Sequence, residues 1–186
     1  MRIIMNHKND TYALNVAIIG EPNVGKSTLL NALVGKKLSI ISRKPQTTRH
    51  RFLGVKTDGN VQCVFVDTPG LHDRQTSLMN RYMNRSALNS MLGVDIIVWV
   101  VNPFAWSDYN QKIVNRLKEN NVDVFLVVNK VDCLKSKSDL LPFVQKASSH
   151  YEFSEIIPIS ALKSDQVDLL WELIAGRAIK QPFFFP

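Results

Sequence analysis

Short apolar runs alternate with stretches of helical spacing along most of the chain. Apolar runs bounded by polar or turn residues predict strands at 14–19, 52–56, 61–66, 94–101, 122–128 and 156–159. Apolar residues at helical spacing predict helices at 26–33, 78–92, 108–120, 138–150 and 167–179. The turn residues Asp58-Gly59-Asn60 join the second and third strands into a hairpin. The polar stretches 36–51 and 67–77 are predicted to be loops.

This order of elements predicts an α/β fold, because strands alternate with helices over short connections. The hairpin makes one strand antiparallel, so we expect a mixed, mostly parallel sheet in a three-layer sandwich. Ser107 or Asp108 is expected to cap the helix that follows. The 186 residues are enough for one domain with a substantial core.

Composition and charge narrow the class of protein only slightly. Hydrophobic residues make up 45% and charged residues 21%, as in ordinary soluble proteins. No apolar run approaches the roughly 20 residues of a membrane-spanning helix, and the first residues lack a signal-peptide core. We therefore expect a cytoplasmic protein, with Cys63 and Cys133 as reduced thiols. The net charge of +7 favours a polyanionic partner, but weakly.

The most specific chemistry follows the first strand, where the chain reads GEPNVGKST. This stretch satisfies G-x-x-x-x-G-K-[ST], in which glycines let successive backbone N–H groups point into one concavity that holds phosphate. We expect Lys26 to bridge the β- and γ-phosphates and Ser27 to bind Mg²⁺. The predicted phosphate-binding residues are Gly20, Glu21, Pro22, Asn23, Val24, Gly25, Lys26, Ser27 and Thr28.

A second motif follows the strand at 61–66. Asp67 at a strand end can hold the metal and its water shell, and Gly70 exposes an N–H that can meet the γ-phosphate. Between the two motifs, Thr47 and Thr48 compete as a loop residue that senses the γ-phosphate, and we favour Thr48. The predicted nucleotide contacts here are Asp67, Thr68, Pro69, Gly70 and Leu71. The predicted metal ligands are Ser27, Thr48 and Asp67.

A third motif, Asn129-Lys130-Val131-Asp132, predicts the base. The Asp132 carboxylate can accept hydrogen bonds from N1–H and the 2-amino group of guanine, neither of which adenine offers. Lys130 can lie on the ring face, and Asn129 can bridge the base and the phosphate loop. After the last strand, Ser160 and Ala161 complete the predicted site, with the Ala161 N–H directed at guanine O6. These motifs together predict a P-loop domain that binds GTP or GDP.

With these motifs, the chain resembles the G domain of the Era family, bacterial ribosome-assembly GTPases of the translation-factor-related class. The resemblance rests on GEPNVGKSTLLNALVGKKLSIISRKPQTTRHR, DTPGLH, NKVD and PISA, and it covers the chain from Leu14 onward. SRKPQTTRHR is more specific than the motifs that all such GTPases share. The resemblance implies a slow GTPase that uses Mg²⁺ and acts in assembly of the small ribosomal subunit.

The resemblance also implies a C-terminal KH domain that binds small-subunit rRNA and the 30S subunit. No G-x-x-G loop of such a domain is present, so we expect three segments: an N-terminal extension at 1–13, a G domain at 14–180 and the start of a linker at 181–186. Phe183, Phe184 and Phe185 in that last segment either fold back on the core or lead into the absent domain. Peripheral association with the inner face of the cell membrane is left open.

The hydrolytic step departs from the better-known small GTPases, because Leu71 stands where many have a water-orienting glutamine. The resemblance offers Asn23 as a holder of K⁺, which would supply charge in place of an arginine finger. His72 is a weaker candidate, as a base. The predicted catalytic residues are Lys26, Thr48, Gly70 and Asn23.

Three other functions stay open at this point. A binding switch with negligible hydrolysis is compatible with Leu71. An ATPase or kinase with the same phosphate loop is disfavoured by the segment Asn129–Asp132. A related tRNA-modification or ribosome-assembly GTPase would share all of these motifs. The basic cluster around the sensing loop, which includes Arg43 and Arg49, is either an rRNA or protein contact or a solvated loop.

Overall fold

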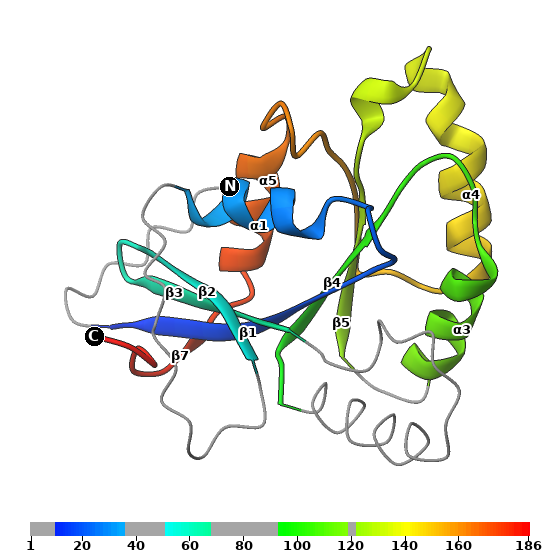
Figure 1. Ribbon diagram of the computed structural model, residues 1–186. Helices are drawn as coiled ribbons and strands as arrows, with labels where there is room; N and C mark the ends of the chain where they lie inside the picture. The colour runs from blue at the N-terminus through cyan, green and yellow to red at the C-terminus, as the bar shows by residue number, and fades with distance from the viewer. Residues whose placement is uncertain (1–9, 36–50, 68–92, 119–121) are drawn as a thin grey trace.

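The computed structural model describes residues 10–35, 51–67, 93–118 and 122–186 (Figure 1). The strands are β1 (Tyr12–Ile19), β2 (Arg51–Asp58), β3 (Val61–Asp67), β4 (Ile96–Val101), β5 (Asp123–Val128), β6 (Glu155–Pro158) and β7 (Ile179–Lys180). The α-helices are α1 (Lys26–Val34), α3 (Asp108–Leu117), α4 (Leu140–His150) and α5 (Val167–Ala175). Residues 36–50 and 68–77 of the predicted loops and the predicted helix at 78–92 lie outside the described residues. Arg51 and Asp67, predicted as the ends of those loops, instead belong to β2 and β3, because the hairpin pairing extends to both residues.

The strands form one mixed sheet in which six follow the order β2-β3-β1-β4-β5-β6, and β7 pairs with β1 outside this order. β1 pairs in parallel with β3 and β4, and the pairs β4–β5 and β5–β6 are also parallel. β2 runs antiparallel to β3, which confirms the predicted hairpin, and Gly59 in its turn has a φ of 58°. The predicted α/β sandwich with a mostly parallel sheet is therefore correct.

Helices cover both faces of the sheet and give the three layers (Figure 1). Alternate residues of β1 point to opposite faces, so Leu14, Val16 and Ile18 join one core cluster and Ala17 and Ile19 the other. The first cluster includes buried side chains of α1 and α5, and the second includes buried side chains of α3 and α4. None of the described helices has the length and hydropathy needed to cross a bilayer.

The predicted helix at 167–179 is wrong at its C-terminal end. α5 stops at Ala175, and the Gly176 N–H donates to Glu172 O at 2.9 Å. Ile179 and Lys180 instead form β7, which pairs antiparallel with Tyr12 and Ala13. The helical spacing of apolar residues extended the prediction past the true end of the helix. A strand of only two residues is too short to show the alternating pattern that would have marked it.

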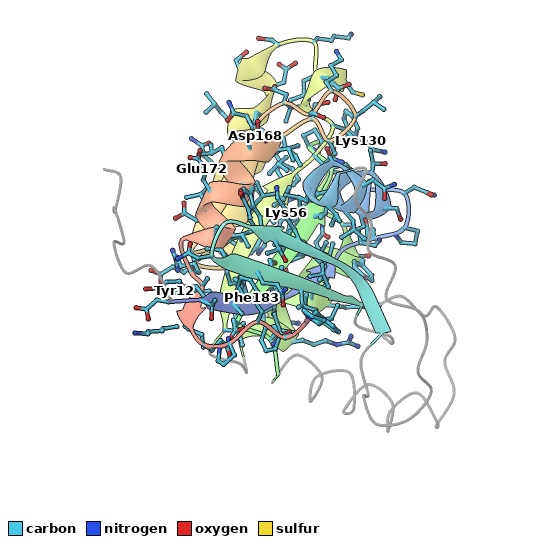
Figure 2. The ribbon with its side chains drawn as sticks, turned by 90° about the vertical axis from the view of Figure 1, so that its left-hand side faces the viewer. Tyr12, Lys56, Lys130, Asp168, Glu172 and Phe183 are labelled. Atoms are coloured by element: carbon cyan, nitrogen blue, oxygen red, sulfur yellow. The ribbon has the colours of Figure 1, made fainter. Side chains whose placement is uncertain are left out.

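The turn end of the β2–β3 hairpin packs against α5. Trp171 Nε1 donates to Asp58 Oδ2 at 3.0 Å, and Lys56 Nζ lies 4.1 Å from the centre of the Trp171 ring. Figure 2 shows Lys56 below the α5 residues Asp168 and Glu172. Burial lowers the pKa of Lys56, and the neighbouring carboxylates of Asp58 and Asp168 oppose that effect.

The C-terminal residues fold back on the sheet. Gln62 on β3 is 1% exposed, and its side-chain amide exchanges two hydrogen bonds with the Phe185 backbone, both 3.0 Å long. Gln181 Nε2 also donates to Ala13 O at 2.8 Å. The Phe185 ring packs against the core, whereas Phe184 stays 41% exposed. Of the two alternatives predicted for these phenylalanines, folding back on the core is therefore the one that Phe185 follows.

Candidate functional site

The predicted motifs meet at one edge of the sheet, because the carboxyl ends of its parallel strands lie together there. Gly20 directly follows β1, Asp67 ends β3 and Asn129 directly follows β5. Ser160 lies two residues beyond β6. α1 begins at the same edge, so its first backbone N–H groups, which a helix leaves without an intrahelical partner, lie beside the loop that connects it to β1.

The loop from Gly20 to Gly25 has the curled backbone that a phosphate cradle requires. Gly20, Asn23 and Gly25 have φ values of 143°, 64° and 100°. A Cβ on Gly20 would lie 2.2 Å from Val100 O, and one on Gly25 would lie 2.3 Å from Asn129 Nδ2. Both glycines are therefore required by backbone conformation and by close packing.

Lys26 reaches back over the loop that precedes it. Its Nζ donates to Gly20 O at 2.8 Å and to Glu21 O at 2.6 Å. Ser27 and Thr28, in the first turn of α1, are exposed. A phosphate bound in the loop would thus meet the Lys26 ammonium and two accessible hydroxyl groups at the positive end of a helix.

Asn129 joins the phosphate loop to the loop after β6. Its side chain is 3% exposed, its Nδ2 donates to Val24 O at 2.8 Å, and its Oδ1 accepts from the Ala161 N–H at 2.9 Å. The expected link to the phosphate loop is therefore present. The Ala161 N–H, which we expect to meet guanine O6, has Asn129 as its partner here, so its contact with a base remains a prediction.

Lys130 ties the third motif to the phosphate loop a second time. Its φ of 69° is left-handed, and its Nζ donates to Asn23 O at 2.6 Å. Figure 2 shows Lys130 beside α1, far from Tyr12 and Phe183. Asp132 lies in the short 3₁₀ helix Val131–Cys133 and is partly buried. The carboxylate thus lies on the same short segment as two residues that hold the phosphate loop.

The remaining predicted site residues are described to different extents. Ser160 is 1% exposed, and its Oγ accepts from the Lys163 N–H at 3.3 Å, which shapes the loop after β6. The backbone of Asp67 pairs with Ile18, one strand away from the phosphate loop, but its side chain is not among those described. The predicted residues that lie wholly outside the described residues are Thr48, Thr68, Pro69, Gly70 and Leu71.

Ser107 also belongs to this edge, although the sequence predicts it only as a helix cap. Its Oγ accepts from the Asn110 N–H at 3.2 Å, which confirms the cap. The same Oγ donates to Glu21 Oε1, which belongs to the phosphate loop, at 2.6 Å. A serine before an acidic residue is a recognisable cap signal, but nothing in the sequence links it to a loop 86 residues away.

Comparison with known proteins identifies the family. Residues 15–130, more than half of the chain, match the family described as 50S ribosome-binding GTPase. The chain belongs to this GTPase family. Within it, the chain is 51% identical over 176 residues to GTPase Era of Coxiella burnetii (strain Dugway 5J108-111), covering 95% of the chain and 59% of that relative. The resemblance to Era seen in the sequence is thus confirmed.

Two solved structures of Era resemble the fold. Era in complex with MgGDPNP and nucleotides 1506–1542 of 16S ribosomal RNA has a TM-score of 0.77 and 38% identity, over 95% of this chain and 60% of that one. An Era variant from Aquifex aeolicus bound to GDP and AlF4⁻ has a TM-score of 0.76 and 37% identity, with the same coverage. The chain therefore spans about three fifths of the length of the relatives it matches.

Proposed function

We propose that this chain is a guanine-nucleotide switch domain that binds GTP and hydrolyses it to GDP and phosphate. One observation carries the proposal: the buried Asn129 holds the phosphate loop at Val24 and the loop after β6 at Ala161. The elements expected to bind phosphate and to read the base are therefore fixed relative to each other. Membership of a GTPase family supports the same function.

Selection of guanine is assigned to Asp132. Its carboxylate is acceptor-only when ionised, so it suits the two adjacent N–H donors of guanine and leaves adenine without a matching pair. A site built for hydrogen bonds rejects an analogue that lacks them, because its own polar group then loses its partner. The partly buried position of Asp132 leaves it accessible to a base.

The residues at the edge fit a bound Mg²⁺. This cation prefers oxygen ligands and keeps several waters, so one or two protein groups beside nucleotide phosphates are enough. The exposed Ser27 hydroxyl lies at the start of α1, and Asp67 ends the strand beside β1. We assign both to the metal, with Thr48 as the third ligand. When bound, Mg²⁺ neutralises charge on the β- and γ-phosphates.

Hydrolysis is attack of water on the γ-phosphate, and positioning with charge neutralisation supplies most of its acceleration. We assign Lys26, the Gly70 N–H and Thr48 to that phosphate. Asn23 is exposed in the phosphate loop and is our candidate holder of K⁺. The competing function is a binding switch with negligible hydrolysis, which the apolar Leu71 leaves open.

Nucleotide binding and turnover test this proposal. We expect titration with fluorescent GDP and ADP to show tight binding of the guanine nucleotide alone. We expect single-turnover GTP hydrolysis to require Mg²⁺ and to run faster in KCl than in NaCl. Equal rates in the two salts would reject the proposed K⁺ stimulation and the role assigned to Asn23. Absence of hydrolysis in both salts would favour the binding switch. Equal affinity for ADP would overturn the proposal.

We further propose that the full-length protein acts on the small ribosomal subunit through 16S rRNA. The support is similarity to Era, which has been captured with a 16S rRNA segment, and the net charge of +7. The family description names the 50S subunit instead. Co-sedimentation of the full-length protein with isolated 30S and 50S subunits decides between them, and 50S binding alone would contradict the proposal. Peripheral membrane association gains no support from these observations.

A further inference from the structure

Glu21 directly follows the first glycine of the phosphate loop, and its side chain reaches out of that loop. Its Oε1 accepts a hydrogen bond of 2.6 Å from Ser107 Oγ at the start of α3. Both side chains are partly buried, so water competes only partly for this contact. A hydrogen bond to a carboxylate is stronger than one between neutral groups, and this one is short.

Ser107 uses both capacities of its hydroxyl group. Its oxygen accepts from the Asn110 N–H at 3.2 Å, so the single O–H is left to donate to Glu21. The Glu21 carboxylate therefore lies at the N-terminus of the ten-residue helix α3, where the helix dipole favours negative charge. Helix cap and carboxylate orient each other.

The main chain of Glu21 is held as well. Its carbonyl accepts from Lys26 Nζ at 2.6 Å, and the preceding carbonyl of Gly20 accepts from the same ammonium at 2.8 Å. Residue 21 is thus held at its side chain by α3 and at its carbonyl by the lysine expected to bind phosphate. Movement of Glu21 would disturb both the curl of the loop and the starting position of Lys26.

We propose that Glu21 and Ser107 form a positioning pair that orders the phosphate loop for nucleotide binding. The pair acts in two ways. It fixes the loop before the nucleotide arrives, so that less conformational entropy is lost on binding. It also turns the Glu21 carboxylate toward α3, which keeps a negative charge from turning toward the phosphates. This inference rests on the proposed function, because it concerns the same site.

Four variants separate positioning from simple support of the fold. S107A removes the cap and the bond to Glu21 together. S107D keeps a good helix cap but opposes the carboxylate of Glu21 with a second one. E21A removes the carboxylate alone. E21Q/S107D restores a donor–acceptor pair with reversed polarity, because the glutamine amide can donate to the aspartate.

The matched control is S154A, which removes a serine–carboxylate hydrogen bond of 3.0 Å to Asp123 at the opposite edge of the sheet. Affinity and dissociation rate are measured with fluorescent GDP, and kcat and KM with GTP, on the full-length protein. Melting without nucleotide reports on the fold. Loss of one charge-assisted hydrogen bond should weaken GDP binding by about tenfold.

We expect E21A, S107A and S107D to raise the GDP dissociation rate and KM by that factor with little change in kcat. S107D should melt near the wild type, E21Q/S107D should recover much of the affinity, and S154A should bind normally. If S107D bound GDP as tightly as the wild type does, the proposed positioning role of Glu21 and Ser107 would be overturned. Failure of the wild type itself to bind GDP would instead reject the proposed function.

Discussion

At the scale of single residues, Gly25 shows how tightly the candidate site is built. Its φ of 100° is unfavourable for any residue with a Cβ, and a Cβ there would lie 2.3 Å from Asn129 Nδ2. The clash falls on the side chain that joins the two halves of the site. An alanine at this position therefore has to displace either the phosphate loop or Asn129.

We expect Gly25→Ala to weaken GDP binding by at least about tenfold and to lower the free energy of unfolding by roughly 1–3 kcal/mol, the usual range for such strain. Fluorescent-GDP titration and urea unfolding measure the two effects. The control is Gly59→Ala in the hairpin turn, where φ is also positive but a Cβ has open space. Comparable loss of GDP affinity in both variants would contradict the role given to Gly25.

At the scale of elements, Gln62 connects β3 to the C-terminal segment. Its buried amide satisfies the N–H and the carbonyl of Phe185 and also donates to Thr57 Oγ1 at 3.1 Å. The same segment extends the sheet through β7. A polar side chain that is 1% exposed is therefore satisfied by main chain from the far end of the sequence.

We expect Gln62→Leu to reduce the free energy of unfolding by about 2 kcal/mol, because two or three hydrogen bonds of roughly 1 kcal/mol each are lost and release of the tail lets water satisfy its backbone. Urea unfolding measures the change. Gln111→Ala, which removes one weak contact of 3.4 Å on α3, is the control. A loss no larger than in that control would show that the tail does not depend on Gln62.

The sequence predicts these elements unevenly. Helix α1 and strand β5 match their predicted positions to within a residue, because their apolar spacing and neighbouring turn residues agree. β7 and the Gln62 contact could not be predicted. Two strand residues carry no period, and a buried glutamine reads as an ordinary polar position in an alternating strand. Pairing across more than a hundred residues becomes visible only in the folded chain.

At the scale of the whole molecule, the buried thiol of Cys63 and the partly buried phenol of Tyr109 predict how stability responds to alkaline pH. Burial raises the pKa of Tyr109 from 10.0 to about 12, with Arg116 opposing the rise and Glu21 adding to it. Burial also raises the pKa of the Cys63 thiol well above its usual value. The unfolded chain releases these protons first, so the folded state binds more protons in the alkaline range.

Stability should therefore fall as pH rises through the interval between the two Tyr109 values, from about pH 10 to about pH 12. We expect Tyr109→Phe to unfold with a shallower pH dependence in that interval, because the variant has no phenol to ionise. Urea midpoints measured at several pH values give the slope. Identical slopes for wild type and variant would contradict the assignment.

The sequence predicts where the motifs of the candidate site lie better than it predicts the side-chain contacts between them. Residue types and spacing place the phosphate loop and the third motif correctly at the carboxyl edge of the sheet, since parallel strands bring successive loops together. Spacing does not reveal that Lys130 holds Asn23, that Asn129 holds Ala161, or that Ser107 holds Glu21. Those contacts depend on side-chain direction after folding, which a linear pattern does not contain.

Exchange of the carboxylate for an amide at position 132 is the sharpest test of guanine selection by this domain. In Asp132→Asn the amide N–H would face the 2-amino group of guanine but would match the 2-oxo group of xanthine. We expect the wild type to prefer GDP over XDP and the variant to reverse this order, losing at least about a hundredfold in GDP affinity. Asp139→Asn, an exposed carboxylate bonded to the Ser136 N–H at 3.1 Å, should retain the wild-type order. Undiminished GDP binding by Asp132→Asn would show that this carboxylate does not select guanine.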